Sequence, residues 1–174
     1  RIVGGRILGE AWPLALSGLA GTLYFHADKL FIFDLLTSAD LGRYALLTQI
    51  VAVLNFVTVA INMSFAPMLN RRFFENVDRF WPVYQRMTAA KLAASLIIAL
   101  IFGLLAPRFL PLLFGAEFYF PADLVAIFSA YIVFVGLGSF SADYMLLQKR
   151  SRQIFYFRLI ALAVNLILNA LFIP

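Results

Sequence analysis

The chain has 174 residues, of which 63% are hydrophobic and 13% are charged, whereas about 25% of the residues in a typical globular domain are charged. It contains no cysteine and a single histidine, which argues against a disulfide framework, a thiolate nucleophile and a metal site built from cysteine or histidine clusters. This composition predicts an integral membrane protein.

Five apolar segments are long enough to cross a bilayer as helices, since a helix needs about 20 apolar residues to span a hydrocarbon core about 30 Å thick. They cover residues 11–36, 44–69, 87–106, 122–147 and 154–173. The second segment runs for 26 residues without a charged side chain. The sequence therefore predicts an all-α, polytopic transmembrane helix bundle that occupies the whole chain, residues 1–174, as a single transmembrane domain.

The basic residues indicate which connections face the cytoplasm. Eleven Arg and Lys residues lie before the first segment, around the connection between the second and third, and around the connection between the fourth and fifth, whereas only Arg43 and Arg108 lie in the other two connections. The positive-inside rule then places the N-terminus in the cytoplasm. We expect a multi-pass protein of the cytoplasmic membrane, in which the net charge of +5 reflects topology and not nucleic-acid binding.

Residues 71–86, between the second and third segments, carry aromatic side chains at helical spacing with charged and amide side chains between them. This pattern favours an amphipathic helix that lies in the membrane interface, with Pro82 either breaking it or opening the third span. A partner-binding helix is the alternative. The connection after the third span contains Gly115 and Pro121 and is expected to be a short turn.

The first span contains His26, Asp28 and Lys29 within the expected hydrocarbon region. A charge there costs about 2.5–3.5 kcal/mol on insertion scales, so such residues are candidates for a substrate or ion path. Asp28 shares a helical stripe with Gly18 and Gly21, which suits a neighbouring helix or a cavity. In the alternative interpretation, Asp28 and Lys29 neutralise each other, or Lys29 extends toward the interface.

Polar stripes are also predicted on three further spans, but not on the third. Their candidate path residues are Asn55 and Asn62 in the second span, Asp143 in the fourth, and Arg158, Asn165 and Asn169 in the fifth. Such stripes either line a polar path or hold helices together, at about 0.6 kcal/mol per hydrogen bond. Because the sequence has no HExxH or GxSxG motif, no enzyme, metal site or cofactor is expected.

Several short motifs follow one another along almost the whole chain. They are Pro13, His26-Ala27-Asp28-Lys29-Leu30, Leu41-Gly42-Arg43-Tyr44, Ala66-Pro67, Leu113-Phe114-Gly115-Ala116-Glu117-Phe118-Tyr119, Asn165-Leu166-Ile167-Leu168-Asn169 and Ile173-Pro174. This series resembles the polysaccharide flippase family, which comprises O-antigen and related lipid-linked oligosaccharide transporters of the multidrug/oligosaccharidyl-lipid/polysaccharide exporter superfamily. It is similar to the second half of those proteins, so the chain is expected to be a fragment of a two-lobed transporter.

The resemblance implies that the parent moves a polyprenyl-diphosphate-linked glycan across the bacterial cytoplasmic membrane by alternating access. Lys29 and Arg158 would then meet anionic groups, the Asn stripes would meet sugar hydroxyls, and Asp28 would carry a coupling proton or sodium ion. The implied partners are membrane lipid, the lipid-linked glycan and the remaining transmembrane helices. Two alternatives stay open, a cation-coupled multidrug or metabolite antiporter of the same superfamily and a non-transporting membrane scaffold.

Overall fold

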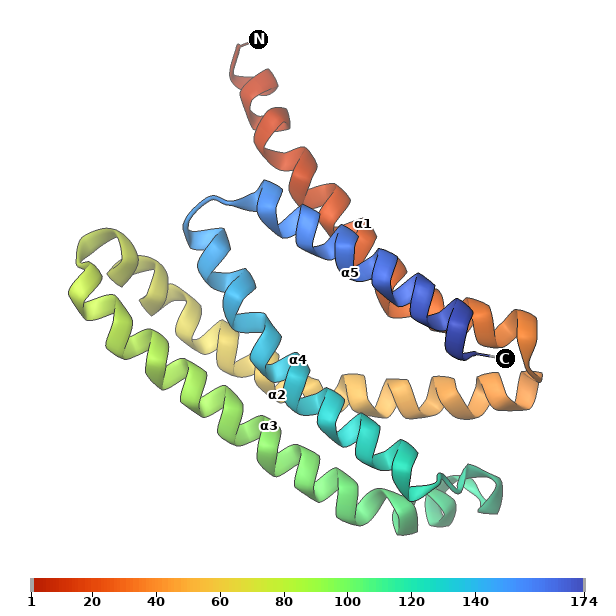
Figure 1. Cartoon of the computed structure of the whole chain (residues 1–174). Coiled ribbons are helices and arrows are strands. Elements are labelled where there is room, and N and C mark those ends of the chain that lie inside the picture. The colour runs from red at the N-terminus through yellow and green to blue at the C-terminus, as the bar shows by residue number, and fades with distance from the viewer. Residues whose placement is uncertain (1, 174) are drawn as a thin grey trace. The chain divides into compact units, whose positions relative to one another are not determined.

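The computed structural model describes the backbone of residues 2–173 and the side chains of residues 11–138 and 143–173. Every regular element in this part of the chain is helical (Figure 1). The elements are α1 (Ile2–Leu35), α2 (Ser38–Glu75), α3 (Val77–Phe114), the 3-10 turn η1 (Ala116–Phe118), α4 (Ala122–Leu147) and α5 (Ser151–Phe172). The predicted all-α fold is confirmed.

Four of the described helices, α2 to α5, are long and apolar enough to cross a bilayer. The expected multi-pass helical membrane protein is confirmed to that extent. Helix α1 covers the first predicted span, and its crossing of the membrane stays a prediction. Arg1 and Arg6, which count toward the predicted orientation, lie outside the residues whose side chains are described.

The chain divides into two compact units, each described by itself below. The first unit consists of Arg1–Leu46 and Ala142–Pro174, and the second of Leu47–Ser141. The first therefore contains α1, α5, the start of α2 and the end of α4. The second contains the rest of α2, all of α3 and η1, and most of α4.

Within the first unit, α1 and α5 lie side by side (Figure 1). Trp12 of α1 and Phe155 of α5 meet edge to face, with ring centroids 5.9 Å apart. On α1, Pro13, Ser17 and Ala20 are buried. Their spacing of three to four residues places them on one face of the helix, and small side chains on such a face allow two membrane helices to approach closely.

The second unit has its core where α2, α3 and α4 present buried side chains. The apolar side chains that are almost completely buried are Leu47 and Val51 of α2, Phe80 and Met87 of α3, and Val125 and Ile132 of α4. Other large apolar side chains stay exposed, such as Leu104 (65%) and Phe134 (70%). Hydrocarbon is as apolar as these side chains, so a lipid-facing helix can expose them without the cost that water would impose.

A capping box opens α2. Thr37 Oγ1 accepts a hydrogen bond from Asp40 N at 3.2 Å, and Asp40 Oδ2 accepts one from Thr37 N at 3.4 Å. These bonds satisfy backbone N–H groups that the first turn of a helix otherwise leaves without partners. The pair therefore fixes the point at which the chain re-enters a helix after α1.

Residues 71–86 form the adjoining ends of two long helices. Asn76 interrupts the helical run with extended backbone (φ −160°), and its Oδ1 accepts from Arg79 N at 3.2 Å. Helix α3 therefore starts at Val77, and Pro82 lies inside it instead of opening it, as was one expectation. The Asn76 side chain caps the helix before the chain reaches Pro82.

The two remaining connections both end helices with left-handed backbone. Gly115 follows α3 with φ of 107°, and its N–H donates to Pro111 O at 3.0 Å, so the predicted turn is confirmed. After α4, Lys149 has φ of 56°, Lys149 N donates to Leu146 O at 3.0 Å and Arg150 N to Met145 O at 2.9 Å. This is a Schellman motif in which lysine holds the position usually taken by glycine.

Candidate functional site

Arg158 is the principal cation of the first unit. It lies in α5, and its Nη1 donates to the backbone oxygen of Ser17 in α1 at 3.0 Å. A carbonyl oxygen has two lone pairs, so Ser17 O can accept this bond in addition to a helical one. Arg158 is an exposed residue, and a guanidinium has five N–H donors. Arg158 therefore ties α5 to α1 and still offers donors to an anionic ligand.

The Arg158 side chain crosses α1 at Gly21, which has no side chain of its own. A Cβ at Gly21 would lie 3.3 Å from Arg158 Nη1, whereas a Cβ at Gly18 would meet nothing within 4 Å. Next to this contact, the buried Oγ of Ser17 has no hydrogen-bond partner among the described residues. The small residues on this face of α1 thus make room for the guanidinium.

Asp28 lies half-buried near the other end of α1. The hydroxyl of Tyr44, in the first turns of α2, donates to Asp28 Oδ2, and the backbone N–H of Lys29 donates to Asp28 Oδ1 at 3.0 Å. Lys29 is half-buried and His26 is exposed. Since Tyr44 and Asp28 are 16 residues apart, the hydrogen bond joins the end of α1 to the start of α2 and holds the carboxylate in one place.

The other predicted residues of the first unit lie on α4 and α5. Asn169 Nδ2 donates to Asn165 Oδ1 at 3.1 Å, a pair one turn apart on α5. Both are half-buried, as is Asp143 near the end of α4. This hydrogen bond uses one donor of Asn169 and one acceptor of Asn165, so both amides keep further donor and acceptor capacity for another group.

The second unit contains a buried lysine. Lys91 of α3 is 1% exposed, and its Nζ donates to Asn62 Oδ1 of α2 at 2.9 Å. A buried charge is costly unless it is paired and hydrogen-bonded, so this contact is a strong constraint on how α2 and α3 meet. Asn62, a predicted path residue, thus lies against a cation.

Ser95 lies one turn from Lys91 on α3 and is fully buried. It faces Gly136 of α4, where an added Cβ would lie 2.9 Å from Ser95 Cβ and would overlap its hydroxyl oxygen. The Oγ of Ser95 has no partner within the described part of the chain. Close approach at Gly136 thus brings α4 onto the polar face of α3.

Asn55, the remaining predicted residue of α2, lies two turns from Asn62. Its backbone oxygen accepts from Thr58 Oγ1 at 2.7 Å, and its buried side-chain oxygen has no donor among the residues described. Lys91 and Ser95 of α3 are therefore buried polar residues, and Asn55 and Asn62 of α2 are half-buried.

The sequence-based expectation that the third span carries no polar stripe was wrong. Lys91 and Ser95 are four residues apart on α3 and both are buried. Lys91 lies near the start of the predicted span and counts among the eleven basic residues that indicate the cytoplasmic side. Its place in the sequence does not distinguish a surface lysine from a buried one. The i, i+4 spacing of lysine and serine amid alanines was the available signal.

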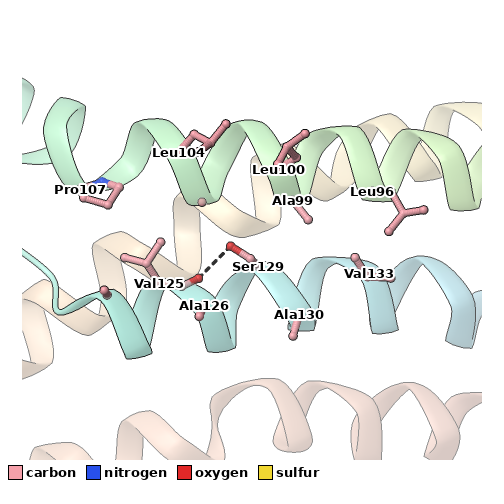
Figure 2. A pocket seen from close by; sticks show the side chains of 12 residues that line it. Leu96, Ala99, Leu100, Leu104, Pro107, Val125, Ala126, Ser129, Ala130 and Val133 are labelled. Carbon is pink, nitrogen blue, oxygen red and sulfur yellow. Dashed lines mark hydrogen bonds between the residues drawn. The ribbon is translucent and has the colours of Figure 1, made fainter.

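A groove of about 510 Å³ lies between α3 and α4 (Figure 2). It is lined by leucine, alanine, valine, glycine and proline side chains, with Ser129 the exception. Ser129 Oγ donates to Val125 O at 2.8 Å, so its hydroxyl is satisfied within its own helix. The groove therefore presents an apolar surface that suits a hydrocarbon chain and no polar ligand.

Comparisons with protein-family models, with curated proteins and with solved structures gave no match to this chain. Among the described residues, no group of three or more His, Asp or Glu side chains could hold a metal ion. The charged and amide side chains within the apolar helices are therefore the groups that can provide the chemistry of the candidate site.

Proposed function

We propose that the chain is part of a membrane flippase that moves a lipid-linked oligosaccharide across the bacterial cytoplasmic membrane, with Arg158 contacting the anionic diphosphate. The observation that carries this proposal is the guanidinium of Arg158 within the apolar helix α5, with one N–H donated to Ser17 O at 3.0 Å and the side chain otherwise exposed. An ionisable group in a membrane helix is expensive and usually functional.

The chemistry of Arg158 fits a phosphate ester better than it fits a neutral or cationic substrate. A guanidinium has a planar fork of donors that matches two phosphate oxygens, and it keeps its charge at any physiological pH. Its hydrogen bond to α1 fixes one edge of the fork and leaves the other edge for the ligand. Asn165 and Asn169, on the same helix, supply amide groups of the kind that bind sugar hydroxyls.

Asp28 supports the coupling step of this proposal and also favours the second candidate function. The Tyr44 hydroxyl donates to its carboxylate, which is an arrangement that can exchange a proton or a cation with a path through the membrane. A cation-coupled antiporter would depend on Asp28 and would tolerate loss of Arg158. A non-transporting scaffold would show no transport, so substitutions at Asp28 and Arg158 would leave flux unchanged.

The test is flipping of a fluorescent lipid-linked oligosaccharide by the complete protein in proteoliposomes, with Arg158→Gln, Arg158→Lys and Asp28→Asn. Arg152 is exposed on the same helix, so Arg152→Gln is the matched control. The flippase predicts a loss of at least tenfold in Arg158→Gln and unchanged flipping in the control. Flipping that survives Arg158→Gln would contradict the assigned role, and cation-driven drug exchange abolished only by Asp28→Asn would favour the antiporter.

A further inference from the structure

Five aromatic side chains gather where α2 ends and α3 begins, and we call them the aromatic tip. They are Phe73, Phe74, Phe80, Trp81 and Tyr84. Phe80 is fully buried at the centre, 5.3 Å from Phe73 and 5.4 Å from both Trp81 and Tyr84 between ring centroids. This packing joins the end of α2 to the start of α3.

Two rings of the aromatic tip keep much of their surface exposed although they take part in this packing. Phe74 is 70% exposed and Trp81 is 43% exposed, and Val77 between them is also exposed. Large apolar side chains that gather exposed at one place are typical of an interaction site. Tryptophan and other aromatic side chains are enriched at the level of lipid headgroups, where an apolar ring body meets a wet layer.

Arginines surround the aromatic tip. Residues 71–86 carry four positive charges (Arg71, Arg72, Arg79 and Arg86) and two negative charges (Glu75 and Asp78). The net charge of this segment is therefore 4 − 2 = +2. Arg71 forms an exposed ion pair with Glu75, with Nε 3.6 Å from Oε2. Arg79 and Arg86 are exposed. The hairpin end is therefore electropositive next to its exposed rings.

Arg72 is the half-buried arginine of this end of the hairpin. Its Nε is buried and has no acceptor among the described residues. Leaving a buried donor without a partner costs about 1–3 kcal/mol, and more for a charged group. Because Nε itself is buried, a phosphate from outside the chain would contact Arg72 at the terminal nitrogens of its guanidinium.

The lengths of the helices place this end at a membrane surface. Helices α2 and α3 each have 38 residues, which corresponds to about 57 Å at 1.5 Å per residue. The hydrocarbon core is about 30 Å thick, so both helices extend well beyond it. The charged residues begin at Arg71, directly after the apolar stretch of α2, so the aromatic tip falls in the headgroup layer.

We propose that the aromatic tip and its arginines bind anionic phospholipid headgroups. Phe74 and Trp81 insert at the boundary between headgroups and acyl chains, and the guanidinium groups of Arg72, Arg79 and Arg86 contact phosphate. Electropositive segments next to a membrane attract anionic lipid, and aromatic side chains fix their depth. This binding site does not rest on the proposed transport activity, since it requires only that α2 and α3 cross the bilayer.

Trp81 makes the site directly observable, because the chain contains two tryptophans and Trp12→Phe leaves Trp81 as the single reporter. The full chain would be reconstituted in liposomes of phosphatidylcholine with and without 30% phosphatidylglycerol. Quenching of Trp81 by lipids brominated near the headgroup would be compared with quenching by aqueous iodide. We expect strong lipid quenching and weak iodide quenching.

The lipid preference is measured with brominated phosphatidylglycerol against brominated phosphatidylcholine. We expect preferential quenching by the anionic lipid, and a loss of about fivefold in this preference for each of Arg72→Gln, Arg79→Gln and Arg86→Gln. Arg108→Gln, at an exposed position near the far end of α3, is the control. Equal quenching by the two lipids, or efficient quenching by iodide instead of lipid, would overturn the proposal. The latter result would place the aromatic tip in water, where it would bind another protein.

Discussion

The ammonium of Lys91 in α3 donates a hydrogen bond to the side-chain oxygen of Asn62 in α2 at 2.9 Å, while Lys91 is 1% exposed. This contact joins two helices that are each long and apolar enough to cross a bilayer. Because a charge away from water depends on its hydrogen bonds, the position of Asn62 is coupled to that of Lys91.

Asn62→Ala should destabilise the protein by about 1–2 kcal/mol, because hydrogen bonds between membrane helices contribute up to about 1.7 kcal/mol and the ammonium would lose an acceptor. Reversible unfolding in detergent by urea or dodecyl sulfate measures the free energy. Asn70 is exposed on the same helix, so Asn70→Ala is the control and should change stability by less than about 0.5 kcal/mol.

A double-mutant cycle with Lys91→Met measures the interaction energy between Asn62 and Lys91 apart from the other effects of each substitution. If the hydrogen bond matters, Asn62→Ala should cost much less in the Lys91→Met background than in the original chain. Equal costs in the two backgrounds would show that Asn62 stabilises the fold by other contacts.

Gly136→Ala should destabilise the second unit by about 1–3 kcal/mol, the usual cost of overpacking. The added Cβ would lie 2.9 Å from the Cβ of Ser95. Gly138→Ala is the matched control, since a Cβ there meets nothing within 4 Å. Thermal unfolding in detergent distinguishes the two. Ser95→Gly should restore stability to Gly136→Ala, and its failure to do so would place the strain elsewhere.

Gly21→Leu should push the Arg158 guanidinium away from Ser17 O, because a Cβ at Gly21 already lies 3.3 Å from Nη1. Gly18→Leu has open space within 4 Å and serves as the control. The chain has no cysteine, so a Trp12→Cys, Phe155→Cys pair reports on α1 and α5 alone through a short thiol cross-linker. We expect the cross-linking yield to fall at least twofold in Gly21→Leu only, and equal yields in both variants would contradict this role of Gly21.

Lys149→Gly should stabilise the turn between α4 and α5 by about 0.5–1 kcal/mol. Lys149 has φ of 56°, a conformation that costs an L-residue with a side chain roughly 1–2 kcal/mol and costs glycine little. Arg150→Gly is the comparison, because Arg150 has φ of −91° and gains nothing from glycine. A melting temperature that rises in Lys149→Gly and not in Arg150→Gly would confirm the strain. A fall in both would refute it.

The sequence determined the fold class and the location of the helices. Uncharged runs such as residues 44–69 admit few structures besides a membrane helix, and α4 coincides with the predicted segment 122–147. Composition alone suffices here because a bilayer requires every backbone N–H and C=O group to be satisfied within a helix or a closed barrel. The helix ends depended on local signals, and Asn76 as an N-cap outweighed Pro82.

Only the tertiary structure decided which polar residues meet. Asp28 was a candidate from its position in an apolar span, but nothing local indicates that Tyr44 donates to it. Likewise, Arg158 donates to Ser17, which is 141 residues away in the sequence. In the sequence Lys91 is indistinguishable from a lysine at a membrane surface, and only the packing of the helices shows that it is buried. Burial and pairing depend on how helices pack, and packing is a property of surfaces from distant segments that no single stretch of sequence contains.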